Sequence, residues 1–221
     1  MMTKEEILAP HQFRHACKEF DAAKKIPEEE FAIVLETGRL SPSSFGFEPW
    51  KFVVVQNQAL REKIKAFSWG AQGQLPTASH YVLILARKAP DLLAGSSYTN
   101  YMMTDIHHLS EEMLKRRDEV YPRFQQEDFE LLENDRLLFE WACRQSYIAM
   151  ANMMTVAAQM KIDSCPIEGF QKDKLEALLA AEGVLDQEHF GLSCMVAFGY
   201  RKKEPRVKTR RKADEVITWI R

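Results

Sequence analysis

The spacing of apolar and polar positions along the chain predicts amphipathic helices and a few buried strands. The helices are expected over residues 10–20, 27–40, 59–67, 98–117, 124–132 and 172–181. Pro122 is expected to break the chain between the fourth and fifth of these helices. β-branched and aromatic runs predict the strands, over residues 50–56, 81–86 and 192–200. A basic, turn-like stretch is expected over residues 201–212.

The longest predicted helix begins after Asn134, whose side chain can cap it, and runs to about Lys161. Its apolar residues extend around much of the circumference, which indicates burial on more than one side. Small residues along it would also let another backbone approach closely: Ala149, Ala151, Ala157 and Ala158.

The mixed order of few strands and many helices indicates the α+β class, a small mixed sheet covered by helices. We expect a single domain over residues 1–221, because no repeat and no linker rich in proline, glycine or serine divides the chain. The sequence contains neither Gly-X-Gly-X-X-Gly nor Gly-X4-Gly-Lys-Ser/Thr, which argues against a dinucleotide-binding fold and a nucleoside triphosphatase.

Composition and charge indicate which kinds of partner and which cellular compartment to expect. The net charge of −2 and the lack of a basic patch interleaved with aromatics disfavour a nucleic-acid binder. No stretch is apolar for long enough to span a bilayer, and the first residues are polar and acidic, so a cytoplasmic protein is expected. Four widely spaced cysteines favour reduced thiols over a disulfide framework or zinc site: Cys17, Cys143, Cys165 and Cys194.

Two N-terminal segments carry residues suited to ligand binding. Arg14 and Lys18 are four residues apart, so on a helix they would share one face and could bind an anion. Taken alone, the pair is better explained as a solvated basic face. The segment from Ser41 to Trp50 holds two prolines, a glycine and three serines. It predicts a rigid loop that presents backbone N–H groups to a ligand, or a plain connection between helix and strand.

Two later segments are similarly ambiguous. Residues 165–170, Cys-Pro-Ile-Glu-Gly-Phe, predict a tight turn with exposed amide N–H groups, or a helix cap followed by a loop. Lys208 and Arg210 would point to the same side of an extended segment and could complete an anion site, or form part of a solvated tail. The neighbouring His107 and His108 would point in different directions on a helix, so no shared metal is expected.

Taken together, the order and spacing of these segments resemble the nitroreductase-like family of FMN-dependent NAD(P)H oxidoreductases. The resemblance covers almost the whole chain and is carried by residues 14–20, 41–44, 49–50, 78–80, 166–170 and 208–210. It implies the nitroreductase-like fold, an interlocked homodimer with FMN at the subunit interface, and NADH or NADPH as the electron donor.

The resemblance implies a phosphate site at the N-terminal and C-terminal segments. Arg14, Lys208 and Arg210 would hold the FMN phosphate, since the guanidinium fork matches phosphate oxygens. His15 and Ala16 would contribute mainly through their backbones. Ala16 stands where many relatives have serine, so a side-chain hydroxyl is missing there.

For the flavin ring, the resemblance implies Lys18, Glu168 and Gly169 as catalytic residues. Lys18 would lie near the N1–C2=O edge and stabilise the negative charge of reduced flavin. The segment from Pro166 through Ile167 to Gly169 would pass over one face of the ring. There, a backbone N–H of Glu168 or Gly169 would meet flavin N5.

The resemblance implies further contacts with the flavin ring, from the partner subunit and from positions that vary within the family. The partner would line the ring and the ribityl chain with Pro42, Ser43, Ser44 and Gly46. The helix over 134–161 would carry much of the dimer contact, with Gln145 as a polar position facing the flavin. Gln74 stands where one branch of the family has lysine, and Ala71 where it has asparagine, so a second cation beside N1 is absent.

The implied reaction is a ping-pong, two-electron reduction of a nitroaromatic or quinone-type acceptor. Walls of the acceptor site are expected from residues 98–129, with Phe124 either lining that site or serving ordinary helix packing. Two alternatives stay open: a flavin-binding sensor or storage protein with little turnover, and a specialised relative such as a reductive dehalogenase.

Overall fold

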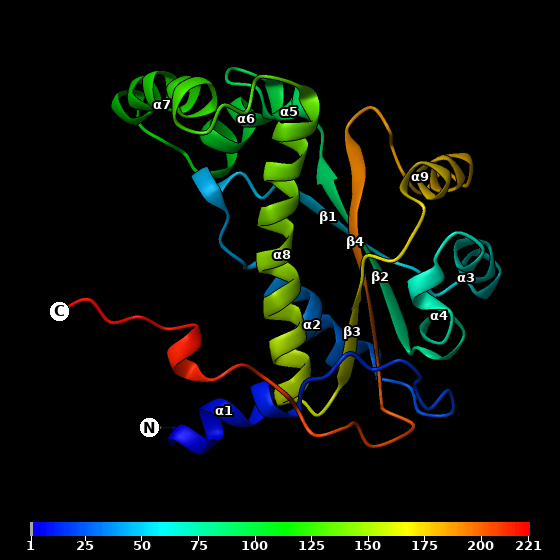
Figure 1. Ribbon diagram of the computed structural model, residues 1–221. Helices are drawn as coiled ribbons and strands as arrows, with labels where there is room; N and C mark the ends of the chain where they lie inside the picture. The colour runs from blue at the N-terminus through cyan, green and yellow to red at the C-terminus, as the bar shows by residue number, and fades with distance from the viewer. Residues whose placement is uncertain (1) are drawn as a thin grey trace.

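The computed structural model describes residues 2–221 and is built around one antiparallel sheet of strand order β1-β2-β4-β3 (Figure 1). The strands are β1 (Trp50–Val54), β2 (His80–Arg87), β3 (Asp163–Ile167) and β4 (Phe190–Gly199). β2 and β4 are the central strands and are almost completely buried. With helices on both faces of this sheet, the predicted α+β class is confirmed, but all three strand pairs are antiparallel, so the expected mixed sheet is wrong.

Alternate residues of β2 face two different parts of the core. Leu83 and Leu85 pack with α3 (Gln58–Lys65) and α9 (Lys172–Ala181) on one face of the sheet. Val82 and Ile84 pack with α2 (Glu28–Arg39) and α8 (Asp135–Gln159) on the other face. Burial on both faces explains why β2 reads as a continuous apolar run.

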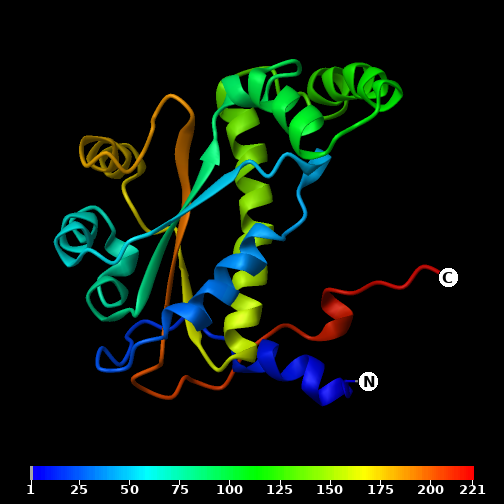
Figure 2. The same ribbon diagram turned by 180° about the vertical axis from the view of Figure 1, so that it is seen from behind.

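Helix α8 is the centre of the molecule, with the sheet on one side and the segment between α2 and β1 on the other (Figures 1 and 2). Asn134 caps it as predicted, because its side chain accepts from the Leu137 amide at 3.2 Å. Gly38 of α2 allows close packing, since a Cβ there would lie 2.8 Å from Met153 Sδ. The α2, α3, α8 and α9 predictions are confirmed to within about three residues at each end.

The helical region near the N-terminal end of α8 differs from the prediction. It contains α5 (Ala89–Leu92), α6 (Ser97–Tyr101) and α7 (Glu111–Arg123). A π-helical turn over Met102–Ile106 interrupts the helix expected over 98–117. The predicted break at Pro122 is wrong, because Pro122 lies inside α7 and a second π-helical turn follows directly. Packing of this aromatic-rich region against α8 outweighs the local effect of the proline.

The N-terminal helix also lies elsewhere. Helix α1 spans Lys4–Phe13 and begins with a capping box between Thr3 and Glu6, so the helix expected over 10–20 is wrong. Residues 14–20 instead run beside β3, where the Cys17 amide donates to the Ser164 carbonyl at 3.2 Å. The free edge of β3 offers backbone groups for this pairing, which a local pattern does not reveal.

Strand β3 is the element that the sequence pattern missed. Residues 165–167 were expected in a turn, but they form the end of this strand and pair with β4. Pro166 is tolerated because β3 lies at the edge of the sheet, where a missing N–H breaks no central ladder.

Beyond β4, the chain passes along the molecule and ends in an exposed arm, residues 213–221, that projects away from the body (Figures 1 and 2). The short helix α4 (Gln74–Thr77) completes the layer with α3 and α9. Among residues 2–221, no helix has the length and hydropathy needed to cross a membrane.

Candidate active site

A cavity of about 630 Å³ lies where the end of α1, the C-terminal half of α8 and the tail after β4 meet. It is lined by Leu8, His11, Gln12, Arg14, His15, Ala16, Tyr147, Met150, Ala151, Met154, Pro166, Lys208 and Arg210. Six of these residues come from three of the segments that the sequence singled out, although they lie up to about 200 positions apart. The fold therefore brings most of the expected phosphate site together within one chain.

One end of this cavity is strongly basic. Arg14 Nη1 donates to Thr155 Oγ1 at 3.0 Å, and Lys208 Nζ donates to the carbonyls of His11, at 2.6 Å, and Arg14. Desolvation, followed by the charges of Arg210 and Arg14, lowers the pKa of Lys208. No aspartate or glutamate is among the lining residues of this part of the described chain. Cations that converge without a counterion favour an anion such as a phosphate.

Arg14 reaches this cavity by a different route from the one expected. It caps the C-terminus of α1 with an extended backbone (φ −60°, ψ 134°), so it shares no helix face with Lys18. The two side chains separate: Arg14 faces the basic end, while Lys18 belongs to a second group of polar atoms near Cys165.

A buried ion pair supports the wall behind His15. Asp163 is only 3% exposed, and its carboxylate accepts from Arg201 Nε at 3.0 Å and from the Arg201 backbone N–H at 2.8 Å, while Arg201 Nη2 lies 2.8 Å away. His15 Nδ1 lies 3.5 Å from the same carboxylate without a hydrogen bond to it. This pair joins the start of β3 to the tail that carries Lys208. Sequence reasoning missed both residues, because neither belongs to a recognisable motif.

Lys18 and Gln74 meet at the thiol of Cys165. Lys18 Nζ lies 3.7 Å and Gln74 Nε2 lies 3.4 Å from Cys165 Sγ. The approach is close because position 73 is glycine: a Cβ there would lie 2.3 Å from the Lys18 carbonyl oxygen. The structure thus places the two predicted ring-edge residues side by side, from segments 56 positions apart.

The turn after β3 is held from two sides. The Tyr147 hydroxyl donates to Glu168 Oε1, and burial together with this carboxylate raises the pKa of Tyr147. On the opposite side, the Gly70 amide donates to the Gly169 carbonyl at 2.7 Å, and a Cβ on either glycine would lie within 3 Å of the other backbone. The turn is therefore rigid, as a cradle for a flat ligand requires.

Trp69 is a candidate site residue that sequence reasoning missed. It is 73% exposed, and its indole Cε3 would lie 3.1 Å from a Cβ built on Gly169. A large aromatic side chain left in water beside a predicted site is the signal that could have identified it.

The residues expected from a partner subunit lie outside the 630 Å³ cavity of their own chain. Pro42, Ser43, Ser44 and Gly46 belong to the segment on the side of α8 opposite the sheet (Figure 2). There, the Ser44 amide donates to Gln145 Oε1 at 2.9 Å. Within one chain, Gln145 therefore faces this segment and lies away from the basic cavity.

Phe124 also lies away from the basic cavity. It packs among aromatic rings, with centroids 4.9 Å from Phe45 and 4.6 Å from Phe129. Within its own chain Phe124 is therefore a packing residue.

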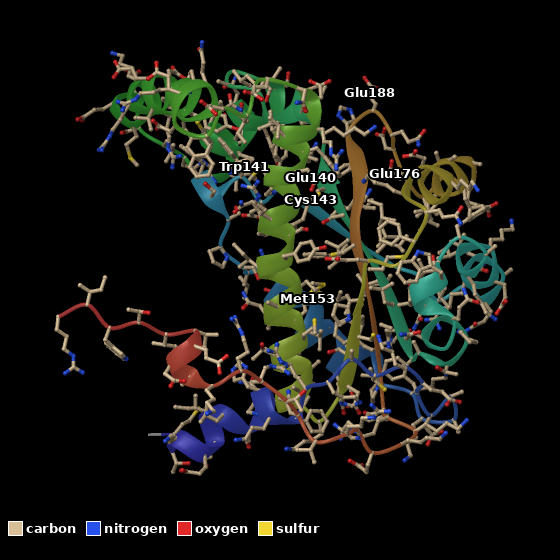
Figure 3. The ribbon with its side chains drawn as sticks, viewed as in Figure 1. Glu140, Trp141, Cys143, Met153, Glu176 and Glu188 are labelled. Carbon is tan, nitrogen blue, oxygen red and sulfur yellow. The ribbon has the colours of Figure 1, made fainter. Side chains whose placement is uncertain are left out.

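A second cavity, of about 870 Å³, adjoins the first at Tyr147, which lines both. Cys143 and Glu140 of α8 line it on the side nearer to α9 and Glu176 (Figure 3). Its other lining residues are Asn134, Arg136, Leu137, Phe139, Arg144, Phe170, Lys172, Leu192 and Ser193. The turn that carries Glu168 thus lies beside two adjoining hollows.

Comparisons with known proteins agree with this geometry. The family model described as the nitroreductase family matches residues 12–200. A Bacillus subtilis protein with the provisional name NAD(P)H nitroreductase YfkO is 51% identical over 217 residues, which is 98% of each chain. A Staphylococcus epidermidis protein with the provisional name NAD(P)H nitroreductase SERP2086 is 54% identical over 215 residues, covering 97% of this chain and 96% of that one.

Solved structures share the fold at lower sequence identity. A provisionally named nitroreductase of Exiguobacterium sibiricum, solved in complex with FMN, superposes with a TM-score of 0.73. The match covers 100% of this chain and 98% of that one, at 20% identity. Together with the family match over most of the sequence, these likenesses show that the chain belongs to the nitroreductase family.

Proposed function

We propose that this protein is an FMN-dependent NAD(P)H oxidoreductase that reduces nitroaromatic or quinone-type acceptors in a ping-pong cycle. The observation that carries the proposal is the basic end of the 630 Å³ cavity, where Arg14, Lys208 and Arg210 converge without an acidic neighbour. The names of the relatives, and the FMN in the Exiguobacterium structure, support the same assignment.

The residues present fit FMN along the whole cavity. The three cations suit a phosphate, and the volume lies within the range of about 300–1,000 Å³ that is usual for small-molecule sites. Beyond the basic end, Pro166, Met150 and Met154 provide an apolar wall for a flat ring. Lys18 and Gln74 meet at Cys165, the residue before Pro166, and would provide N–H donors for the polar edge of such a ring.

Each group of residues has a distinct task in the proposed reaction. FMN, when bound, supplies the hydride chemistry, which is a property of the cofactor itself. Arg14, Lys208 and Arg210 hold its phosphate and set its position. The Lys18 ammonium stabilises the negative charge that the ring carries after reduction. The backbone amides of Glu168 and Gly169 would help to orient the bound ring.

We further propose that the functional unit is a homodimer. Within one chain the cavity has no cover from residues 42–46, which the family resemblance assigns to the partner. The C-terminal arm also exposes Val216, Ile217, Trp219 and Ile220 by 52–95%. Apolar side chains that project from the body in this way favour burial against a second copy (Figure 1).

The acceptor is proposed only as a class. Trp69 adds an exposed aromatic surface beside Gly169. A site of this kind selects flat apolar molecules without strong discrimination among them, which suits both nitroaromatics and quinones.

The test is the visible spectrum of purified protein, before and after anaerobic addition of NADPH or NADH. We expect flavin bands that bleach on addition and return when menadione or 4-nitrobenzoate is supplied. Bands that persist with both nucleotides would identify a flavin-binding sensor or storage protein instead. A colourless protein that also fails to take up added FMN would refute the proposal. Parallel lines in double-reciprocal plots would support the ping-pong order, and intersecting lines would refute it.

A further inference from the structure

The contacts of Cys165 form a small polar cluster at the border of an apolar core, where Cys165 and Gln74 are buried and Lys18 is exposed. The side chain is fully buried, and its Sγ lies within 3.7 Å of both Lys18 Nζ and Gln74 Nε2. For residues 2–221, this sulfur is the only hydrogen-bond partner of either donor. A thiol sulfur is a weak acceptor, so two strong donors share one weak partner.

The proton of the same thiol is donated to the backbone of the segment that lines the ligand cavity. Cys165 Sγ donates to the Pro166 carbonyl oxygen at 3.6 Å, and Pro166 lines the 630 Å³ cavity. The thiol therefore donates its hydrogen to the backbone of the turn and accepts from Lys18 and Gln74 with its lone pairs. Its hydrogen bonds connect the two donors to the segment that would face the ring of a bound ligand.

The weakness of the sulfur as an acceptor has a physical consequence. A carboxylate at this position would neutralise Lys18 and bind it strongly, since charge-assisted hydrogen bonds are about twice as strong as neutral ones. The thiol restricts where the ammonium and the amide lie, but leaves their hydrogens available. This restriction matters for Gln74, which is 2% exposed and has little alternative contact with solvent.

We propose that Cys165 is a positioning residue: its sulfur holds Lys18 and Gln74 as a pair of donors directed at the electron-rich edge of the FMN ring. This inference rests on the proposed function. The pair stabilises reduced FMN more than oxidised FMN, because only the reduced ring carries negative charge at that edge. Holding the ammonium in place makes one lysine and one glutamine sufficient where a second cation is absent.

A buried cysteine can also be a simple core residue, and Cys194 is an example of this kind. It is equally buried, but its Sγ contacts Met150 Sδ at 3.7 Å in the core on the other face of the sheet. Cys194→Ala therefore removes a buried thiol without touching Lys18 or Gln74. It is a matched control for the loss of volume and packing.

The test compares Cys165→Ala, Cys165→Ser and Cys194→Ala in the FMN-loaded protein. The measurements are the midpoint potential of the bound flavin and the Kd of oxidised FMN. We expect Cys165→Ala to lower the preference for reduced over oxidised FMN about tenfold, which moves a two-electron potential by about 30 mV to more negative values. Cys165→Ser, which keeps an acceptor, should recover at least half of this shift. Cys194→Ala should leave the potential unchanged.

A second measurement needs no cofactor. The S–H infrared stretch of Cys165, identified by its loss in Cys165→Ala, should shift in FMN-free Lys18→Met and Gln74→Leu variants. An unshifted band in both, or a wild-type potential in Cys165→Ala, would overturn the positioning role while the proposed function stands. Failure of the wild-type protein to bind FMN would overturn both.

Discussion

The Arg210 side chain makes few contacts within its own chain. It is exposed, and its Nη1 donates to the neighbouring Thr209 carbonyl at 2.6 Å. Arg210→Ala should therefore change the free energy of unfolding by less than about 0.5 kcal/mol. It should weaken FMN binding about 10–100-fold, because a hydrogen bond to a charged group contributes about 1.5–3 kcal/mol. Fluorescence titration with FMN and urea denaturation measure the two effects.

The adjacent Arg211 provides the control for this prediction. It is exposed but does not line the cavity, so Arg211→Ala should bind FMN as the wild type does. Equal losses of affinity in the two variants would indicate a general electrostatic effect of the tail, and unchanged affinity in Arg210→Ala would remove this residue from the phosphate site.

His80 makes stability depend on pH. Its ring is 5% exposed and stacks on Phe31 with centroids 3.9 Å apart. Burial, followed by the charges of Arg61 and Lys25, lowers the pKa of His80 to about 4. The unfolded chain binds this proton near pH 6.5, whereas the folded chain does not. Stability from this residue is therefore complete above about pH 6.5 and is lost as the pH falls toward 4.

Replacing the imidazole should flatten this dependence. Between pH 7 and pH 4, His80→Asn should lose on the order of 2 kcal/mol less unfolding free energy than the wild type. The measurement is urea denaturation at intervals of one pH unit. His108→Asn is the control, since His108 is exposed and adopts a positive φ of 49° that asparagine tolerates. Parallel pH curves for the wild type and His80→Asn would contradict the assignment.

At the scale of elements, β3 is attached to the tail by the ion pair between Asp163 and Arg201. Asp163→Asn would leave the Arg201 guanidinium without its main partner in a largely buried position. We expect a loss of about 3–5 kcal/mol in the free energy of unfolding, measured by urea denaturation. FMN affinity should fall as well, because the same pair positions the segment that leads to Lys208.

The second ion pair of Arg201, with Glu204, provides the control for this prediction. Its Nη1 also lies 3.1 Å from Glu204 Oε2, but the Glu204 side chain is 85% exposed. Glu204→Gln should therefore change the free energy of unfolding by less than about 1 kcal/mol. Similar losses of unfolding free energy in Asp163→Asn and Glu204→Gln would show that burial does not make the Asp163–Arg201 pair more stabilising than the exposed pair.

At the scale of the whole molecule, the exposed arm predicts how two copies associate. Deleting residues 213–221 removes no part of the sheet, whose last strand ends at Gly199, so the truncated chain should stay folded. Burial of even two large apolar side chains contributes about 3 kcal/mol or more. Sedimentation velocity should therefore show a dimer for the full chain and at least a hundredfold weaker association after deletion.

A milder variant separates the apolar contacts from the length of the arm. Trp219→Ser combined with Ile220→Ser keeps the arm but removes its two most exposed apolar side chains near the C-terminus. It should weaken dimerisation, whereas Leu93→Ser, at an exposed apolar position outside the arm, should not. Unaltered association in the truncated chain would exclude the arm from the interface.

The α+β class and the long capped helix could be predicted from the sequence alone, which also singled out the residues that we propose for the phosphate site. The helix was predictable because its cap at Asn134 and its apolar surface are local features of consecutive residues. Strands β2 and β4 were predictable for the same reason, since burial on both faces leaves continuous apolar runs. The motif at 166–170 and the pair Lys208 and Arg210 could be singled out only through the family resemblance, because each segment alone was at least as compatible with a loop or a solvated tail.

How those residues meet depends on contacts between distant parts of the chain. Residues 14–20 lie along β3 instead of forming a helix, because the open edge of a distant strand supplies hydrogen bonds that no local pattern records. Pro166 enters that strand because its position is at the edge of the sheet. The contacts of Cys165 with Lys18 and Gln74 join three separate segments. Contacts between distant segments arise from packing of the whole chain, whereas caps and periodicity arise from neighbours in sequence.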